Sequence, residues 1–442
     1  MKKLILTILA LAVFSTIYAQ KDLLQSGPMV GYSTMKEVLL WVQTNKEAKV
    51  HFEYWNTIDP SIKYKTEQVI TSRSKAYIAR ALADKLEPDN HYNYALFINN
   101  IKVERPYKLS FESQPLWLWR SDAPDYSFAT GSCTYVSEEK YDRPGKPYGG
   151  DYQIFDAIYK KEPNFMLWLG DNVYLREADW NSKTGIAYRY THTRSLPEMQ
   201  PMLGSMHHYA IWDDHDYGPN DSDRSYHLKR ETEKVFKLFF TNPNYIFDEG
   251  TTGFFQWADS EFFLLDNRYW RTPNKRSDLD KHQILGNKQI EWLIDALKNS
   301  YAPFKFVVMG GQFLNPLERN EIYANLAPEE KYKILKAIEE LKINGVIFLT
   351  GDVHHTELTK LDLDGGYPLY DLTVSPITSG VYGKNAEDNP LQVAGTLVKE
   401  RNYSLIKVFG SKKERTLEIS IYNSNGKKLW VKEIKAKSLK FK

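Results

Sequence analysis

Cysteine is nearly missing from this sequence: Cys133 is the single cysteine among 442 residues. One cysteine cannot form a disulfide within the chain, so a small scaffold held together by disulfides is excluded. Three interpretations of the thiol remain open at this point. It is an inert buried side chain, one half of a bridge to another molecule, or a thiolate with a chemical role.

An excess of charge of one sign is also missing. The 58 lysines and arginines nearly balance the 56 acidic residues, so that the formal net charge is +2. No stripe rich in lysine or arginine is visible either, which argues against a nucleic acid or an anionic membrane as the main partner. The proportions of hydrophobic and charged residues, 42% and 26%, are those of an ordinary globular protein.

Long apolar runs are absent after the first twenty residues, which predicts no transmembrane helix in the rest of the chain. The beginning, MKKLILTILALAVFSTIYAQ, has a positive end at Lys2 and Lys3, an apolar segment and the small residue Ala19. This pattern is typical of a signal peptide, here residues 1–19, and predicts a secreted or periplasmic protein. Loss of the two lysines would bring the net charge to about zero.

The sequence predicts two domains after the signal peptide. Residues 20–120 contain short β-branched and aromatic runs separated by turns, which favours a small all-β sandwich. From residue 121 to 442 apolar strands alternate with helical segments, which indicates an α/β domain. Helices are expected in 148–161, 220–240, 288–300 and 331–345, and a terminal hairpin with an Asn-Gly turn in 403–434.

Four apolar strands of the second domain end in polar side chains. Because ligands of α/β sheets bind outside the carboxyl ends of strands, we expect these side chains to meet at one edge. The four strand ends are NFMLWLGDNVY with Asp171 and Tyr174, YAIWDDHDYGPND with Asp213, Asp214, His215 and Asp216, FKFVVMGGQF with Gln312, and GVIFLTGDVHH with Asp352, His354 and His355.

Each strand end also has a plainer interpretation when it is taken alone. Asp171 is compatible with a turn or a helix cap, and Asp352 with His354 is compatible with a capped turn. The DDHD segment is compatible with a solvated acidic loop, although three carboxylates around one histidine repel each other unless cations compensate. The combination of several such ends after separate strands favours a hydrolytic metal site.

Cys133 follows the first strand of this domain, in DYSFATGSC, and would reach the same edge as Asp171 and Tyr174. A bound cation would stabilise its thiolate, which makes the chemical role the preferred interpretation of the lone cysteine. A thiolate and a phenolate suit a charged transition metal, whereas carboxylate and amide oxygens suit a hard ion such as Ca²⁺ or Mg²⁺. The donors therefore indicate two kinds of metal ion.

The same motifs, in the same order, give the sequence a resemblance to the PhoD-like alkaline phosphatases of the metallophosphatase superfamily. The opening segment GPMVGYSTMKEVLLWVQTN is similar to the β domain with which that family begins. The ordered motifs that carry the resemblance are GSC, GDNVY, WDDHD, LDNRYWR, ILGNKQIEWL and GDVHH.

The resemblance implies a four-layer αββα sandwich with a cluster of Fe³⁺ and Ca²⁺ at one edge of its sheets. It implies that Cys133 and Tyr174 bind iron and that Asp171 bridges metal ions. It further implies the following roles: Asp214 in the position of the superfamily's metal-binding asparagine, His215 as the histidine that faces phosphate, Asp352 and His354 as the remaining metal ligands, and Arg268 of LDNR as a group that binds substrate phosphate.

The sequence departs from the family pattern in four places. Asp216 stands where many members have glutamate, and Asn220 is the candidate for an asparagine ligand that follows less directly than in relatives. A glycine precedes Gln312 where relatives often have another polar residue. His355 is additional, and we interpret it as an outer hydrogen-bonding residue rather than a ligand.

The predicted function is metal-dependent hydrolysis of a small phosphomonoester, with a water activated by metal and with His215 as a proton or hydrogen-bond donor. The alternative on the same scaffold is a phosphodiesterase or phospholipase. A different class is a secreted binding protein in which metal ions only stabilise loops. The adjacent Asp214 and His215 argue against this last interpretation, because structural Ca²⁺ loops rarely need a proton donor beside them.

Overall fold

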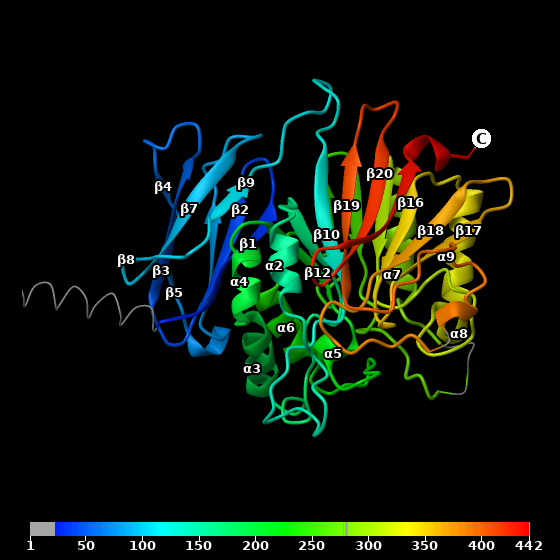
Figure 1. Ribbon diagram of the computed structural model, residues 1–442, viewed down its shortest axis with the longest axis horizontal. Coiled ribbons are helices and arrows are strands. Elements are labelled where there is room, and N and C mark those ends of the chain that lie inside the picture. Colours follow the sequence, from blue (N-terminus) through cyan, green and yellow to red (C-terminus); the bar gives the residue numbers. More distant parts are fainter. Residues whose placement is uncertain (1–22, 277, 279–281, 385, 442) are drawn as a thin grey trace, which may run out of the picture. The chain divides into compact units, whose positions relative to one another are not determined.

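The computed structural model shown in Figure 1 describes residues 23–276, 278, 282–384 and 386–441. The predicted signal peptide lies outside these residues. The chain forms two compact units, one made of Met1–Leu116 with Arg194–His207 and the other of Trp117–Thr193 with His208–Lys442. The sequence analysis places the domain boundary at 120/121, and no pattern in it indicates that residues 194–207 return to the first unit.

The first unit is built from two antiparallel sheets, as the short alternating runs predicted. One sheet has the strand order β1-β2-β6, and the other has the order β4-β3-β7-β8, with β5 beside β3 and β9 beside β7. The strands are β1 (Leu24–Ser33), β2 (Val38–Thr44), β3 (Lys49–Asn56), β4 (Tyr64–Lys65), β5 (Val69–Ile70), β6 (Ile78–Ala83), β7 (His91–Ile98), β8 (Ile101–Val103) and β9 (Ser110–Glu112). The short helix α4 (Gln200–Leu203) belongs to the same unit.

Aromatic and β-branched side chains fill the core of this first unit. The ring of Tyr54 lies 6.0 Å from that of Phe111, and Phe111 stacks on Tyr92 at 5.3 Å. Leu40 of β2 and Leu96 of β7 belong to the same fully buried cluster. Large aromatic side chains contribute much burial each, so this core is stabilised by apolar packing.

The strands of the second unit belong to two sheets. In one sheet they follow the order β21-β20-β19-β10-β11-β12, and the six strands of the other follow the order β13-β14-β15-β16-β18-β17. The strands of this unit in the first sheet are β10 (Tyr126–Gly131), β11 (Phe165–Leu169), β12 (His207–Ile211), β19 (Asn402–Phe409), β20 (Thr416–Asn423) and β21 (Lys428–Lys435). Those of the second are β13 (Gly253–Trp257), β14 (Ser260–Leu264), β15 (Phe304–Val308), β16 (Val346–Thr350), β17 (Glu357–Asp362) and β18 (Pro368–Thr373).

Phenylalanine rings from both sheets form the core of the second unit. Phe128 of β10 meets Phe262 and Phe306 edge-on, at ring distances of 5.4 and 5.5 Å. The edge-to-face arrangement is the one that aromatic quadrupoles favour. The two sheets therefore pack face to face through an aromatic layer.

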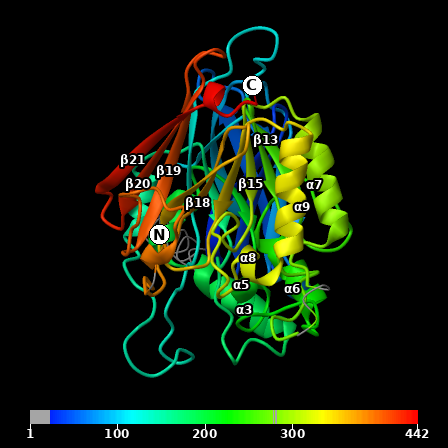
Figure 2. The same ribbon diagram turned by 90° about the vertical axis from the view of Figure 1, so that its right-hand side faces the viewer.

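Helices cover the outer faces of the two sheets. On the first sheet, Phe155 of α2 (Ile154–Tyr159) lies 6.3 Å from Trp168. On the second, Trp292 of α7 (Asn287–Asn299) lies 6.2 Å from Phe263, and α7 runs beside α9 (Pro328–Glu340) in Figure 2. The predicted four-layer αββα architecture is confirmed. The remaining helices are α3 (Lys183–Arg194), α5 (Asp214–Tyr217), α6 (Lys229–Phe239) and α8 (Tyr323–Leu326).

Strand direction brings the polar segments of the second unit to one edge. β10 and β11 are parallel, and so are β14, β15, β16 and β18. The carboxyl ends of these strands lead into the segments that hold Cys133, Asp171, Asp266–Arg268, Gln312 and Asp352. The predicted clustering at strand ends therefore has its structural basis in this parallel pairing.

A membrane-spanning helix is absent from the part of the chain that the structure describes, since no helix there combines sufficient length with sufficient apolar character.

Candidate metal centre

Two glycines let the loops at this edge approach each other closely. Gly170 has φ 91°, and a Cβ on it would lie 2.8 Å from the Cβ of Asp213. A Cβ on Gly351 would lie 2.6 Å from the Cβ of Ser132. Both separations are far below van der Waals contact, so these positions require glycine for the loops after β10, β11, β12 and β16 to meet.

The first group of candidate ligands consists of Cys133, Asp171, Tyr174 and His354. One donor atom each from Cys133, Asp171 and His354 can be chosen so that all three lie within 4.8 Å of one another. The Tyr174 hydroxyl lies 3.1 Å from Asp171 Oδ2 and 3.2 Å from His354 Nε2. Cys133 Sγ lies 3.6 Å from the same Asp171 oxygen. Sulfur, phenol, carboxylate and imidazole thus converge on a small volume.

The ring of His354 is oriented by a backbone carbonyl. Its Nδ1 lies 2.6 Å from the carbonyl oxygen of Gly380, which can only accept a hydrogen bond. Nδ1 therefore carries the proton, and the lone pair of Nε2 faces Tyr174 and Asp171. Histidines that bind metal ions usually donate from their other nitrogen to a carbonyl or carboxylate in this way.

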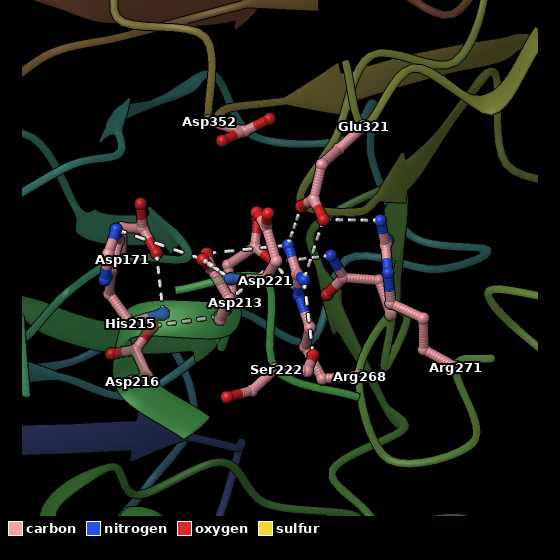
Figure 3. Close-up of polar contacts among 12 residues, drawn as sticks. Asp171, Asp213, His215, Asp216, Asp221, Ser222, Arg268, Arg271, Glu321 and Asp352 are labelled. Carbon is pink, nitrogen blue, oxygen red and sulfur yellow. Dashed lines mark hydrogen bonds and ion pairs between the residues drawn. The ribbon is translucent and has the colours of Figure 1, made fainter. Parts of the chain in front are cut away.

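The second group consists of Asp171, Asp214 and His215, whose donor atoms also lie within 4.8 Å of one another. The backbone NH of His215 donates to Asp171 Oδ1 at 3.3 Å, and Figure 3 shows the two residues side by side. The His215 ring stacks on Tyr174 with 4.2 Å between ring centres. Asp171 is the residue shared by the two groups.

Four of the candidate ligands have an unusual backbone conformation. Cys133, Asp171, Asp352 and His354 have φ values of 63°, 52°, 71° and 59°, in the left-handed region that non-glycine residues seldom adopt. Each such residue costs of order 1 kcal/mol or more, and they gather at functional sites where surrounding structure holds them. The residues with strained backbone conformations are therefore residues that the strand-end pattern predicted as candidate ligands.

The site holds more negative charge than its neighbours compensate. Burial, followed by the nearby Asp214 and Cys133, raises the pKa of Asp171 well above its ordinary value. Burial, followed by Asp213 and Glu321, does the same to the pKa of Asp352. Burial also raises the pKa of the Cys133 thiol to about 12. A bound cation would reverse all three effects, because it stabilises the charged form of each group.

Asp214 and His215 differ from these acids. Burial alone would raise the pKa of Asp214, but His215 and Arg268 outweigh it and hold this pKa below its usual range. Burial lowers the pKa of His215, although Asp214 works against that shift. Asp214 is therefore ionised beside Arg268 at neutral pH.

Comparison with known proteins finds one family model that matches part of the chain. Residues 251–419, which include LDNRYWR, match the model of the PhoD-like phosphatases. The chain is 21% identical to alkaline phosphatase D of Bacillus subtilis over 348 residues, which are 66% of this chain and 55% of that protein. The match thus spans little more than half the length of the curated relative.

Two solved structures share the fold of this chain. A structure of PhoD matches with a TM-score of 0.75 and 16% identity, covering 93% of this chain and 92% of that one. A purple acid phosphatase, PPD1 from seeds of yellow lupin (Lupinus luteus), matches with a TM-score of 0.66 and 11% identity, covering 93% of this chain and 74% of that one. At these identities the likeness shows the metallophosphatase fold.

Two of the expected ligands belong to neither group of donors. Asn220 is exposed, whereas the backbone NH of the next residue, Asp221, donates to Asp214 Oδ2 at 2.8 Å. The carboxylate of Asp352 lies outside both groups of donors within 4.8 Å, and Figure 3 draws no contact between it and Asp171. The backbone carbonyl of Asp352, 3.4 Å from Cys133 Sγ, is its contact with the first group.

Arg268 differs most from its expected role. Its side chain is 1% exposed and pairs with Asp213 and Glu321, with Asp214 at 3.5 Å. In Figure 3 the guanidinium lies between these carboxylates, and Arg271 meets Glu321 from the other side. Instead of reaching out towards a phosphate, Arg268 neutralises the buried acids behind the centre.

Gln312 and His355 also lie outside both groups. Gln312 Nε2 donates to Glu357 Oε1 at 2.6 Å and to Thr373 Oγ1 at 3.1 Å. His355 Nδ1 lies 3.0 Å from the carbonyl oxygen of Val353, within a backbone turn. Both side chains therefore belong to polar networks under the loops.

Sequence reasoning missed several contributors to the centre. Ser375 Oγ donates to Cys133 Sγ at 3.1 Å and accepts from the backbone NH of His354 at 3.0 Å. Ser375 follows β18, so one further strand end, VSPIT, was the available signal. Glu321 lies in an irregular segment before α8, where the sequence has no comparable signal.

Proposed function

We propose that this protein is a metal-dependent phosphoesterase that hydrolyses phosphomonoesters. The family and the fold support the reaction class. The observation that carries the proposal is the position of Asp171, whose two carboxylate oxygens serve different groups: Oδ2 faces Cys133 and Tyr174, and Oδ1 faces His215. A carboxylate in that position is suited to bridge two cations.

The donor set fits two kinds of ion. Cys133, Tyr174, His354 and Asp171 supply sulfur, phenol, imidazole and carboxylate donors, which suit Fe³⁺. Carboxylates of Asp171, Asp214 and Asp352 suit Ca²⁺. The buried acids support cation binding independently, because burial and neighbouring acids raise the pKa of Asp171 and that of Asp352. The proposal does not extend to Asn220, whose side chain is exposed.

The residues of the chain have distinct roles in the proposed reaction. When bound, the ions would neutralise phosphate charge and lower the pKa of a water molecule. Asp171 would hold both ions close together, and Tyr174 would position the His215 ring by stacking on it. His215, partly exposed beside the ionised Asp214, would donate a hydrogen bond or a proton towards the phosphate or the leaving group.

The test combines elemental analysis with an activity assay on natively expressed full-length protein. We expect iron and calcium in the protein, and hydrolysis of a phosphomonoester that a chelator abolishes and metal restores. A protein that contains neither metal, or whose turnover survives complete chelation, would contradict the proposal. Parallel assays with a monoester, a diester and a phospholipid separate the monoesterase from the alternative phosphodiesterase or phospholipase. Binding of phosphate without turnover in metal-loaded protein would indicate the binding protein instead.

Export from the cell is part of the proposal, since residues 1–19 have the pattern of a signal peptide. Fractionation of the native host checks it: we expect the activity outside the cytoplasm, and a cytoplasmic enzyme would contradict it.

A further inference from the structure

Tyr148 lies at the solvent side of the candidate metal centre, and none of the roles above uses it. It belongs to the loop between β10 and α2, and its side chain is 43% exposed. Its hydroxyl lies 3.0 Å from His354 Nδ1, and its ring centre lies 5.9 Å from that of His354 and 6.4 Å from that of Tyr174. The ring thus adjoins the candidate ligands and the ring of Tyr135, whose centre lies 4.9 Å away, and stays partly exposed to solvent.

The position of this ring is fixed by packing. A Cβ on Gly380 would lie 2.6 Å from Cε2 of Tyr148, so the ring can lie on this backbone only because residue 380 is glycine. Arg401 joins the two segments: it donates to the carbonyl oxygens of Tyr148 at 3.1 Å and Ser379 at 2.9 Å, and to Asp151 Oδ2 at 3.0 Å. An aromatic side chain held in this manner is preorganised for contact with a ligand.

Two further exposed side chains follow in sequence the glycine on which the Tyr148 ring lies. Val381 and Tyr382 directly follow Gly380 and are 43% and 55% exposed, and the backbone NH of Tyr382 donates to the carbonyl oxygen of His354 at 3.0 Å. We call Tyr148, Val381 and Tyr382 the aromatic rim. Two basic side chains of the neighbouring segments, Lys399 beside Gly383 and Arg401 beside Gly150, are paired with Glu387 and Asp151.

We propose that the aromatic rim is the subsite for the alcohol part of the phosphoester, and that it selects esters of aromatic or apolar alcohols over esters of small polar alcohols. The inference rests on the proposed function, which places the phosphate at the candidate metal centre. The alcohol part of such an ester must extend from the phosphate towards solvent, and the Tyr148 ring lies on that side of His354. An exposed ring there gains contact and loses water when an apolar group covers it.

The first test measures binding, so that it does not depend on turnover. Metal-loaded full-length protein is titrated calorimetrically with phenylphosphonate and with methylphosphonate, which share a phosphate-like head and cannot be hydrolysed. We expect the wild type to bind phenylphosphonate about tenfold more tightly, the gain typical of one good aromatic contact. In Tyr148→Ala this preference should fall about five- to tenfold, while binding of methylphosphonate stays within about twofold of the wild type.

Three further variants separate the contribution of the Tyr148 ring from that of its hydroxyl and from that of any exposed tyrosine. Tyr148→Phe keeps the ring and removes the hydroxyl near His354, so the preference should remain. Tyr382→Ala should weaken it about two- to threefold, as expected for a more peripheral contact. Tyr301→Ala is the matched control: Tyr301 is 99% exposed and precedes β15 at the end of the strand away from the centre, so nothing should change. Circular dichroism and metal content are measured for each variant.

Several outcomes would overturn the inference. The first is equal binding of the two phosphonates by the wild type, and the second is no binding of either. The third is an equal loss of affinity for both phosphonates in Tyr148→Ala with unchanged metal content. That result would make Tyr148 a positioning residue for His354. If Tyr148→Ala fails to fold or to retain metal, the phosphonate preference of Tyr382→Ala decides instead. Turnover of phenyl phosphate and glycerol phosphate separates this inference from the proposed function. If the protein prefers phenylphosphonate but hydrolyses neither ester, the proposed function is contradicted and the subsite inference is not. If it hydrolyses the esters without preferring the aromatic compound, the subsite inference is contradicted and the proposed function is not.

Discussion

The two units of the chain differ in what they bury. Among the described residues of the first unit, no aspartate or glutamate is buried, and its interior consists of aromatic and aliphatic side chains with hydroxyls, amides and two histidines as the main polar groups. The described residues of the second unit include ten buried acidic side chains, among them Asp171, Asp213, Asp214 and Asp216 near the candidate metal centre. The first unit is thus stabilised by apolar packing, whereas the second unit has buried negative charge that must be compensated.

The compensation in the second unit comes in two forms. Behind the centre, Arg268 and Arg271 pair with Asp213 and Glu321. At the centre itself, Asp171 has no basic partner among the contacts of the described residues, and its pKa is raised. Buried negative charge that no basic side chain balances is suited to a bound metal ion. The comparison thus predicts where each unit is sensitive to substitution.

The largest effect is expected for Asp171→Asn. The change removes the shared carboxylate, so phosphatase activity should fall about 10³-fold or more, equivalent to about 4 kcal/mol of transition-state stabilisation. The fold should persist, and the chelated variant should be at least as stable as the chelated wild type because one buried acid is gone. Initial rates and thermal unfolding after chelation check both parts. Unchanged turnover would reject the site, and a large loss of stability in the chelated variant would reject the charge argument.

A substitution behind the centre tests the other form of compensation. Arg268→Met should lower the free energy of unfolding by about 4 kcal/mol, because Asp213 and Glu321 would remain buried without their partner. The double variant with Glu321→Gln should lose clearly less than the sum of the two single changes. Denaturant unfolding monitored by fluorescence measures each value. Additive losses, or a loss below about 1 kcal/mol for Arg268→Met, would show that the pairing is not what stabilises this edge.

The sequence predicted most accurately those features that depend on parallel strands. The apolar runs predicted both fold types, and their last residues brought Cys133, Asp171, Tyr174 and His354 together, because parallel strands present their carboxyl ends at one edge. Periodicity likewise located α7 and α9, whose apolar positions recur at helical spacing.

The sequence did not allow loop geometry or long-range ion pairs to be predicted. Glu321 meets Arg268 across 53 positions, and no local pattern encodes that partner. The resemblance to the family motif makes Asn220 a candidate ligand, whereas in the loop after α5 its side chain is exposed and the NH of Asp221 contacts Asp214 instead. The left-handed conformation of Cys133 and Asp352 is imposed by surrounding loops and not by residue preference. Tyr148 was one of 30 tyrosines, without a signal of its own.

The third prediction concerns pH and the first unit. His207 is neutral and buried: its Nδ1 lies 2.8 Å from the carbonyl oxygen of Gly31, its Nε2 lies 3.3 Å from the backbone NH of Glu112, and burial lowers its pKa to about 4. Unfolded histidine takes up a proton below about pH 6.5, so the unfolded state binds more protons between pH 6.5 and 4. The stability of this unit should therefore fall by about 3 kcal/mol as the pH drops through that window.

Hydrogen exchange of peptides from β1 and β2 reads the stability of the first unit separately. In His207→Gln the amide can replace both hydrogen bonds without titrating, so the dependence between pH 6.5 and 4 should flatten, apart from the smaller contribution of His51 with the same sign. The same steep dependence in the variant would show that another group titrates.

The smallest effect is expected for an ion pair of the first unit, which sharpens the comparison with Arg268. Lys36 Nζ lies 3.3 Å from Glu87 Oε2, but the side chains are 65% and 78% exposed. Water solvates both charges in either state, so Lys36→Ala should change the free energy of unfolding by less than about 0.5 kcal/mol. Hydrogen exchange of the same β1 and β2 peptides, at low and at moderate salt, measures it. If the free energy of unfolding fell by more than about 1 kcal/mol, the first unit would also be stabilised by ion pairs. The burial of charged side chains would then not explain the difference between the two units.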